Sequence, residues 1–284
     1  MNHRDERLGS APLGKLMFSL ALPSVAAQLI NVLYNIVDRI YIGHIPGYGD
    51  VALTGVGVTF PILTMISAFS AFAGMGGAPL ASIQLGKKNK QGAEQILGNS
   101  AGLLILFSVI LTAFFSICKT PILYAFGASD ATIVYARDYI SIYLIGTIFV
   151  QLTLGMNAFI TAQGFAKTSM LTTVIGAVIN IILDPILIFG FGLGVRGAAI
   201  ATVLAQGISA VLGVVYILRG YPELRFTPRQ LGAATRRAVT SMFWAGLSMG
   251  LMSAIYNLGS VALQSSINAL GSVYITAQTA ARRL

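Results

Sequence analysis

The stretch ILGNSAGLLILFSVILTAFFSIC, residues 96–118, runs for 23 residues without one charged side chain. About 20 apolar residues in an α-helix cross the roughly 30 Å hydrocarbon layer of a lipid bilayer. The whole chain has the same character, because 56% of its 284 residues are hydrophobic and only 10% are charged. A soluble domain of that composition would lack the polar residues that its outer surface needs. The sequence therefore predicts an all-α integral membrane protein.

Six further stretches have a similar length and composition, and an eighth begins near Ser272. The seven stretches cover residues 17–42, 58–84, 96–118, 139–163, 170–189, 198–218 and 238–267. We expect four parts along the chain. They are a cytoplasmic N-terminus (residues 1–16), a lobe of six transmembrane helices (17–218), a basic cytoplasmic inter-lobe loop (219–237) and the start of a second lobe (238–284).

The basic residues indicate how the chain is oriented in the membrane. The spans leave 12 of the 18 Lys and Arg residues on the side of the N-terminus and 6 on the other side or within the membrane. Loops rich in Lys and Arg stay in the cytoplasm, so we expect a cytoplasmic N-terminus. The net charge of +9 follows from this topology, and we expect no nucleic-acid partner.

A weak internal repeat relates the first span to the seventh. An ungapped shift of 222 residues places LYNI, residues 33–36, over IYNL, residues 255–258. Six spans separate the two copies, and an even number gives both copies the same orientation, as in transporters built from parallel repeats. Two such repeats would need about twelve spans. We therefore expect the chain to end inside the second repeat.

Three charged side chains fall inside the predicted spans: Asp38, Arg39 and Asp184. Charges in a membrane are costly and commonly mark a functional site. Asp38 lies about 6 Å and Asp184 about 8 Å from the outer end of its span, at the helical rise per residue. Thr202 reaches a similar depth in the next span. These three oxygen-bearing side chains predict a shared site in the outer half of the lobe.

The residues around Asp184 favour a cation site. Asn180 and Asp184 are one helical turn apart and share a helix face. Pro185 has no N–H, so the carbonyl of Ile181 loses its helical donor. Oxygen ligands of this kind suit a hard cation such as Na⁺, whereas a proton would bind the carboxylates directly. The alternative is that Asp184 and Pro185 only end the helix near the interface, and the choice between Na⁺ and H⁺ stays open.

The first span carries a polar stripe, because Asn31, Tyr34 and Asp38 fall on one helix face. The stripe predicts contact with a water-filled cavity, although interhelical hydrogen bonds for packing are an equal alternative for Asn31 and Tyr34. Pro23 is expected to kink the span. We expect Arg39 to reach the outer interface of the membrane rather than the site.

The sequence contains no recognisable catalytic motif. It has no His-Glu-x-x-His, no Gly-x-Ser-x-Gly and no Walker lysine loop, and His3 and His44 are its only histidines. These motifs carry the metal, nucleophile and phosphate chemistry of many enzymes. We therefore expect no enzymatic activity and no cofactor other than a coupling ion.

Three motifs carry a family resemblance: YNIVDRIYIG at residues 34–43, QGFAKT at residues 163–168 and NIILDPILIFG at residues 180–190. The third is followed by GVRGAAIAT at residues 194–202. They resemble the multidrug and toxic compound extrusion (MATE) family of the MOP flippase superfamily. The resemblance implies a multi-pass protein of a bacterial inner membrane, with two six-helix lobes, monomeric when complete. It implies export of organic, often cationic drugs in exchange for Na⁺ or H⁺ by alternating access.

The resemblance also implies roles for individual residues. The coupling-ion site, including a possible Na⁺ site, maps onto Asp38, Asn180, Asp184 and Thr202. The substrate cavity maps onto Asn31, Tyr34, Tyr139 and Asn157. Another branch of the family uses an acidic residue in the seventh span, but no Asp or Glu follows Glu223 here.

Two alternatives to drug export remain open. A flippase for lipid-linked precursors should carry several cationic residues in its cavity to bind pyrophosphate, whereas the charges inside these spans are mainly acidic. A non-transporting membrane module would have no use for a coupling-ion site. Membrane lipids surround the protein in every case.

Overall fold

The computed structural model describes residues 12–220, 240 and 244–247. Residues 12–220 form α-helices and π-helical turns joined by short loops, and this part of the chain contains no β-strand. The prediction of an all-α membrane fold is therefore confirmed. Most of the expected N-terminal segment, nearly all of the inter-lobe loop and most of the expected second lobe lie outside the described residues.

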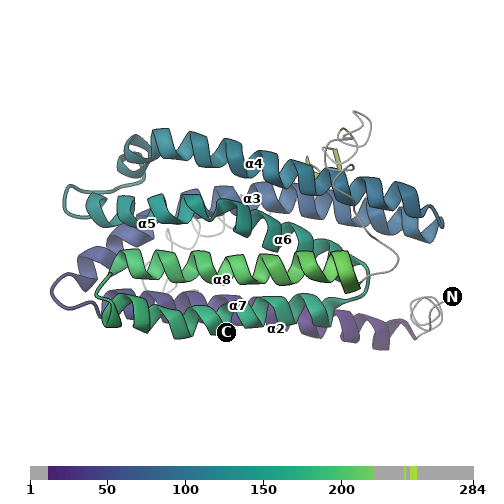
Figure 1. Cartoon of the computed structure of the whole chain (residues 1–284), viewed down its shortest axis with the longest axis horizontal. Helices are drawn as coiled ribbons and strands as arrows, with labels where there is room; N and C mark the ends of the chain where they lie inside the picture. The colour runs from purple at the N-terminus through teal and green to yellow at the C-terminus, as the bar shows by residue number, and fades with distance from the viewer. Residues whose placement is uncertain (1–11, 221–239, 241–243, 248–284) are drawn as a thin grey trace, which may run out of the picture.

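The helices lie side by side along the long axis of the molecule (Figure 1). They are α2 (Leu13–Gly43), α3 (Gly49–Gly86), α4 (Lys90–Ala125), α5 (Ile133–Ile145), α6 (Thr147–Ala162), α7 (Ala166–Pro185) and α8 (Val195–Val215). Two π-helical turns, η1 (Ile186–Gly190) and η2 (Tyr216–Gly220), extend α7 and α8. Within the described residues, five helices can cross a membrane by length and composition, or six spans if α5 and α6 together form one.

The fourth span differs from the continuous helix expected over residues 139–163. It is broken at Gly146 into α5 and α6, whose axes differ by 58°. A Cβ atom at Gly146 would lie 2.5 Å from a Val203 methyl carbon on α8. Only a glycine at position 146 therefore lets this backbone lie so close to α8. The second span also begins earlier than expected, since α3 starts at Gly49 rather than near residue 58.

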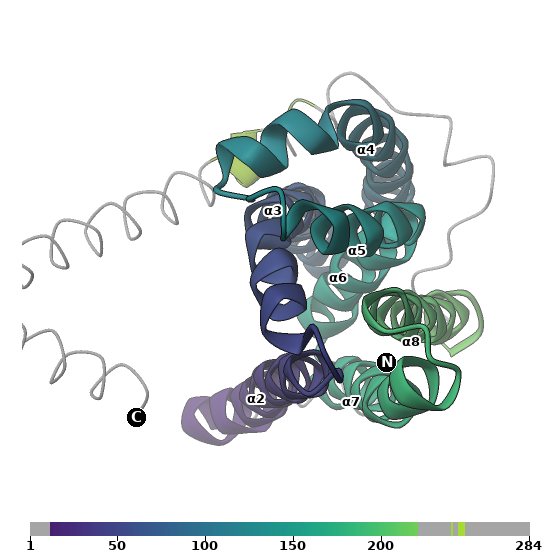
Figure 2. The ribbon, with the colours of Figure 1, turned by 90° about the vertical axis from the view of Figure 1, so that its left-hand side faces the viewer.

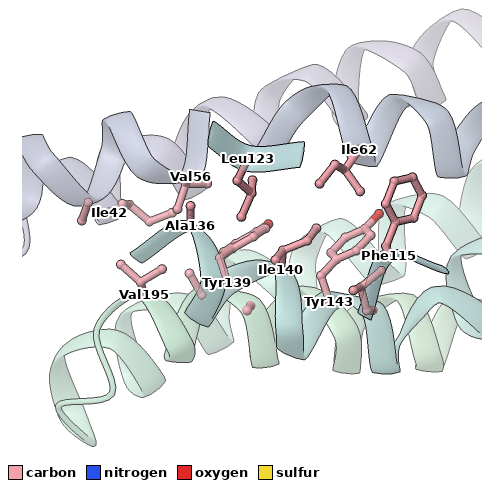
Figure 3. Packing of buried hydrophobic residues seen from close by; sticks show 14 of the residues in the cluster. Ile42, Val56, Ile62, Phe115, Leu123, Ala136, Tyr139, Ile140, Tyr143 and Val195 are labelled. Carbon is pink, nitrogen blue, oxygen red and sulfur yellow. The ribbon is translucent and has the colours of Figure 1, made fainter. Parts of the chain in front are cut away.

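A buried apolar core joins α3, α4, α5 and the start of α8. Figure 3 shows Ile62 and Phe115 close to Tyr143, while Val195 lies near Tyr139 and Ala136. By contrast, many large apolar side chains on the outside of the bundle are exposed, as Ile117 is at 82%. Exposed apolar side chains of this size suit a surface that faces lipid.

The arrangement of α2, α7 and α8 positions the polar residues. The end-on view in Figure 2 shows α7 between α2 and α8, and these neighbours pack against each other along their lengths. The loop from η1 to α8 turns at Gly194, whose φ of +54° favours glycine. Gly197 then packs against the backbone of Leu187 and Ile188. This close approach brings the N-terminal part of α8 beside the end of α7.

Candidate functional site

Two carboxylates from different helices lie in the interior of the bundle. Asp184 on α7 is 0% exposed, and Asp38 on α2 is 7% exposed. The side-chain amide of Asn180, one turn before Asp184, donates a hydrogen bond to Asp184 Oδ1 at 3.2 Å. Asp38 is near enough to Asp184 for the two carboxylates to interact electrostatically. The fold therefore brings together the two acidic residues that the sequence placed at similar depth.

Three buried oxygens of the residues expected to bind the ion lack a hydrogen-bond partner among the described residues. They are Oδ1 of Asp38, Oδ1 of Asn180 and Oδ2 of Asp184. A buried polar atom without a partner costs about 1 to 3 kcal/mol, and a buried charge costs more. A bound cation or a proton on a carboxylate would offset that cost. The donor set consists of carboxylate and amide oxygens, which fit a hard cation such as Na⁺.

Two cavities adjoin these carboxylates. The smaller, of about 40 Å³, is lined by Asn180 and Thr202 among others, and the larger, of about 320 Å³, is lined by Asp38 and Thr202. Tyr34, Thr202 and Gln206 line both. Asp184 lines neither and lies beside Asn180. Thus three of the four residues expected to bind the ion line a cavity, and the fourth is hydrogen-bonded to one of them.

The residues expected to line the substrate cavity all lie at these two cavities. Asn31, Tyr34 and Asn157 line the smaller one, while Tyr139 lines the larger one. Asn157 is tied to α7, because its Oδ1 accepts a hydrogen bond from Thr172 Oγ1 at 3.0 Å. Tyr139 stacks on Tyr143, with ring centroids 6.2 Å apart (Figure 3). The cavity walls therefore combine amide groups with aromatic rings.

Arg39 is exposed and also borders the larger cavity, whereas its expected position at the outer interface of the membrane stays a prediction. Arg39 lines the larger cavity, and its guanidinium carbon lies 5.8 Å from the ring centroid of Phe60 on α3. A guanidinium over an aromatic face is attracted by the ring quadrupole, which the sequence of α2 alone does not reveal. Within the described part of the chain, Arg39 is the only basic residue that lines these two cavities.

Gln206 on α8 lines both cavities, although no motif in the sequence marks it. Its Oε1 is buried and has no hydrogen-bond partner in the described part of the chain. Its backbone carbonyl accepts a hydrogen bond from Thr153 Oγ1 at 3.1 Å, which joins α8 to α6. The sequence feature that could have indicated Gln206 is its position in an apolar span, four residues after Thr202 and therefore on the same helix face.

An ion pair joins α5 to α8 near the site. Arg196 binds Asp138 through two contacts, Nε to Oδ2 at 2.9 Å and Nη2 to Oδ1 at 3.1 Å. Asp138 precedes the cavity residue Tyr139, and Arg196 lies six residues before Thr202. Both side chains are partly exposed, and exposed pairs of this kind contribute little to stability.

Comparison with known proteins places these features in context. The family model described as MatE matches residues 23–186. The multidrug export protein MepA of Staphylococcus haemolyticus (strain JCSC1435) is 29% identical over 252 residues, which cover 88% of this chain and 55% of MepA. A protein of Shewanella oneidensis named FAD transporter is 28% identical over 215 residues, covering 74% of this chain and 47% of that protein.

Solved structures show the same fold. A crystal structure of MATE in the bent conformation superposes with a TM-score of 0.84 at 26% identity. The match covers 95% of this chain and 60% of that one. The chain thus spans about half to three fifths of the length of these relatives.

Proposed function

Because this chain belongs to the MatE family, we propose that it acts as a lobe of a secondary antiporter that exports organic compounds, many of them cationic drugs or toxic metabolites. Na⁺ or H⁺ entering the cell down its gradient drives the export. The relative from Staphylococcus haemolyticus, a multidrug export protein, supports this class of substrate.

The observation that carries the proposal is the cluster of unpartnered, buried oxygens on Asp38, Asn180 and Asp184 beside two cavities. With no cation bound, the carboxylates attract an organic cation in the cavity, and this attraction is strong where water is scarce. Binding of Na⁺ or H⁺ neutralises the carboxylates and weakens that attraction. A ligand that binds one state better shifts the population toward it, so ion binding and substrate release become linked.

The proposal includes the membrane orientation. The protein lies in the inner membrane of a bacterium with its N-terminus in the cytoplasm, and it works as a monomer by alternating access. The distribution of Lys and Arg along the sequence supports this orientation. Residues 17–218 form the six-helix N-lobe, and the basic segment 219–237 links it to a second lobe of the same orientation.

A second candidate is export of an anionic metabolite. Two observations favour it: Arg39 lines the larger cavity, and one relative is named FAD transporter. A flippase for lipid-linked precursors fits less well, because it should carry several cationic residues in its cavity, whereas Arg39 is the one basic side chain among the described residues that line either cavity.

Transport in lipid vesicles tests the antiporter. The protein is reconstituted, and efflux of a fluorescent organic cation is followed under separately imposed Na⁺ and H⁺ gradients. We expect efflux under one gradient, and that gradient identifies the coupling ion. Asp184→Asn should abolish the gradient-driven component, because it removes the negative charge that attracts the coupling ion.

Asp50→Asn is the matched control, since Asp50 is an exposed carboxylate in the first turn of α3 that lines neither cavity. It should transport as the unaltered protein does. Equal gradient-driven efflux by Asp184→Asn and the unaltered protein would show that Asp184 has no part in coupling. A non-transporting membrane module would show no gradient-driven efflux in any variant.

A further inference from the structure

The larger cavity places two side chains of opposite charge side by side on α2. Asp38 is buried, whereas the next residue, Arg39, is exposed and lies at the wall of the cavity toward α3. Successive residues in a helix point about 100° apart, so the two side chains have different surroundings. The acidic group belongs to the buried oxygen cluster described above, and the basic group interacts with that cluster only electrostatically, through Asp38.

The guanidinium of Arg39 is positioned by an aromatic ring and not by an acid. It lies over Phe60 at 5.8 Å from the ring centroid, and no acidic side chain of the described residues lies within ion-pair distance of it. The five N–H groups of a guanidinium lie in its own plane and point outward from it, so the ring contact leaves them available to a ligand. These N–H groups form a planar fork that matches a carboxylate, sulfonate or phosphate.

The remaining wall of the cavity offers aromatic faces and hydrogen-bond acceptors. Phe60 is 56% exposed, and Tyr34, Tyr139 and Tyr143 also line the cavity. The Asn35 amide nitrogen donates to the carbonyl of Asn31 at 2.7 Å. The Oδ1 atom of Asn35 therefore remains as the acceptor that this side chain can offer to the cavity.

The volume of the cavity, about 320 Å³, falls within the range of small-molecule sites. Flat rings gain contact area against aromatic walls and prefer offset or edge-to-face arrangements with them. An N–H group on such a ring could donate to Asn35. A ligand that used all of these features would combine a planar ring system with one anionic group.

We propose that Arg39 and Phe60 form an anion subsite within the substrate cavity, which binds the phosphate, sulfonate or carboxylate of a planar aromatic compound. This subsite rests on the proposed role of the lobe in transport, because it specifies a class of substrate for the same cavity. It extends that class from organic cations to aromatic compounds that carry an anionic group.

Equilibrium binding of two related flavins tests the subsite. Riboflavin and riboflavin 5′-phosphate share one ring system and differ by the phosphate, and their fluorescence reports binding to the purified protein in lipid nanodiscs. We expect the unaltered protein to prefer the phosphate form. Arg39→Gln should weaken binding of the phosphate form by about tenfold or more, because a charged hydrogen bond is lost. Its affinity for riboflavin should stay unchanged.

Two further variants separate the charge of Arg39 from its planar geometry and from the overall charge of the protein. Arg39→Lys keeps the charge but loses the planar fork, so its preference for the phosphate form should be intermediate. Arg137→Gln removes one exposed positive charge that lines neither cavity, and it should bind both flavins as the unaltered protein does. This control corrects for the loss of overall positive charge.

Three results would overturn the subsite. They are a protein without preference for the phosphate form, an Arg39→Gln variant that keeps the full preference, and a variant that loses both flavins equally. The measurement uses no ion gradient. Flavin binding therefore tests the subsite alone. The antiporter is tested separately, by the efflux of the unaltered protein and of Asp184→Asn.

Discussion

The side-chain amide of Asn180 holds Oδ1 of Asp184 at 3.2 Å, while Oδ2 of the same carboxylate has no hydrogen-bond partner among the described residues. The two residues are one turn apart on α7, immediately before Pro185 ends the α-helix and the backbone widens into the π-helical turn η1. One oxygen of Asp184 is therefore fixed by its own helix, and the other is available to a ligand. Widened helical turns of this kind often accompany functional sites.

Thr202→Val should separate the two possible coupling ions. The substitution keeps the size of the side chain but removes its hydroxyl, which is buried beside the cavities. If Na⁺ is the coupling ion, the Na⁺ concentration for half-maximal efflux should rise by about tenfold, the equivalent of one lost polar contact. If H⁺ is the coupling ion, the efflux should change little, because the carboxylates stay in place. Thr202→Ser is the control that keeps the hydroxyl.

An unchanged Na⁺ dependence in Thr202→Val, in a protein already shown to use Na⁺, would remove Thr202 from the ion site. A loss of efflux under both gradients would instead indicate that the hydroxyl contributes to packing between α8 and α5.

Gln206→Leu should weaken substrate binding without abolishing ion coupling. Gln206 lines both cavities with an unpartnered buried Oε1, but it does not belong to the oxygen cluster of Asp38, Asn180 and Asp184. Loss of one neutral hydrogen bond to a substrate corresponds to about 0.5 to 1.5 kcal/mol, which is roughly a twofold to tenfold weaker affinity. Binding of a fluorescent organic cation and the ion dependence of its efflux measure the two effects separately. An unaltered affinity would show that the substrate does not contact Gln206.

Gly197→Ala should destabilise the protein. A Cβ atom there would lie 2.7 Å from the carbonyl carbon of Leu187 and 2.9 Å from the backbone nitrogen of Ile188, and backbone atoms cannot move aside as a flexible side chain can. Overpacking of this kind costs about 1 to 3 kcal/mol. The apparent unfolding temperature in detergent micelles should therefore fall.

Gly57→Ala is the matched control, because nothing lies within 4 Å of a Cβ atom at that position in α3. Alanine in a helix interior is favoured over glycine by about 1 kcal/mol, so its unfolding temperature should be equal or higher. Equal unfolding temperatures for Gly197→Ala and the unaltered protein would contradict the close contact between α8 and η1.

Much of the fold follows from local properties of the chain. Apolar stretches such as residues 96–118 predict membrane helices because transfer of each side chain into lipid is nearly independent of its neighbours. The approximate depth of Asp38, Asp184 and Thr202 follows from the constant rise of a helix. Spacing along one helix likewise predicts the contact between Asn180 and Asp184, because residues one turn apart share a face.

Contacts between helices account for the features that local patterns did not reveal. At the break at Gly146, α8 approaches the backbone closely, with Val203 against the glycine. Arg39 lines the larger cavity with its guanidinium near Phe60, a residue of a different helix. Composition and helical periodicity thus account for the membrane spans and the depth of the carboxylates. The partner of each side chain depends on packing between residues far apart in the chain, and no periodicity within one helix encodes it.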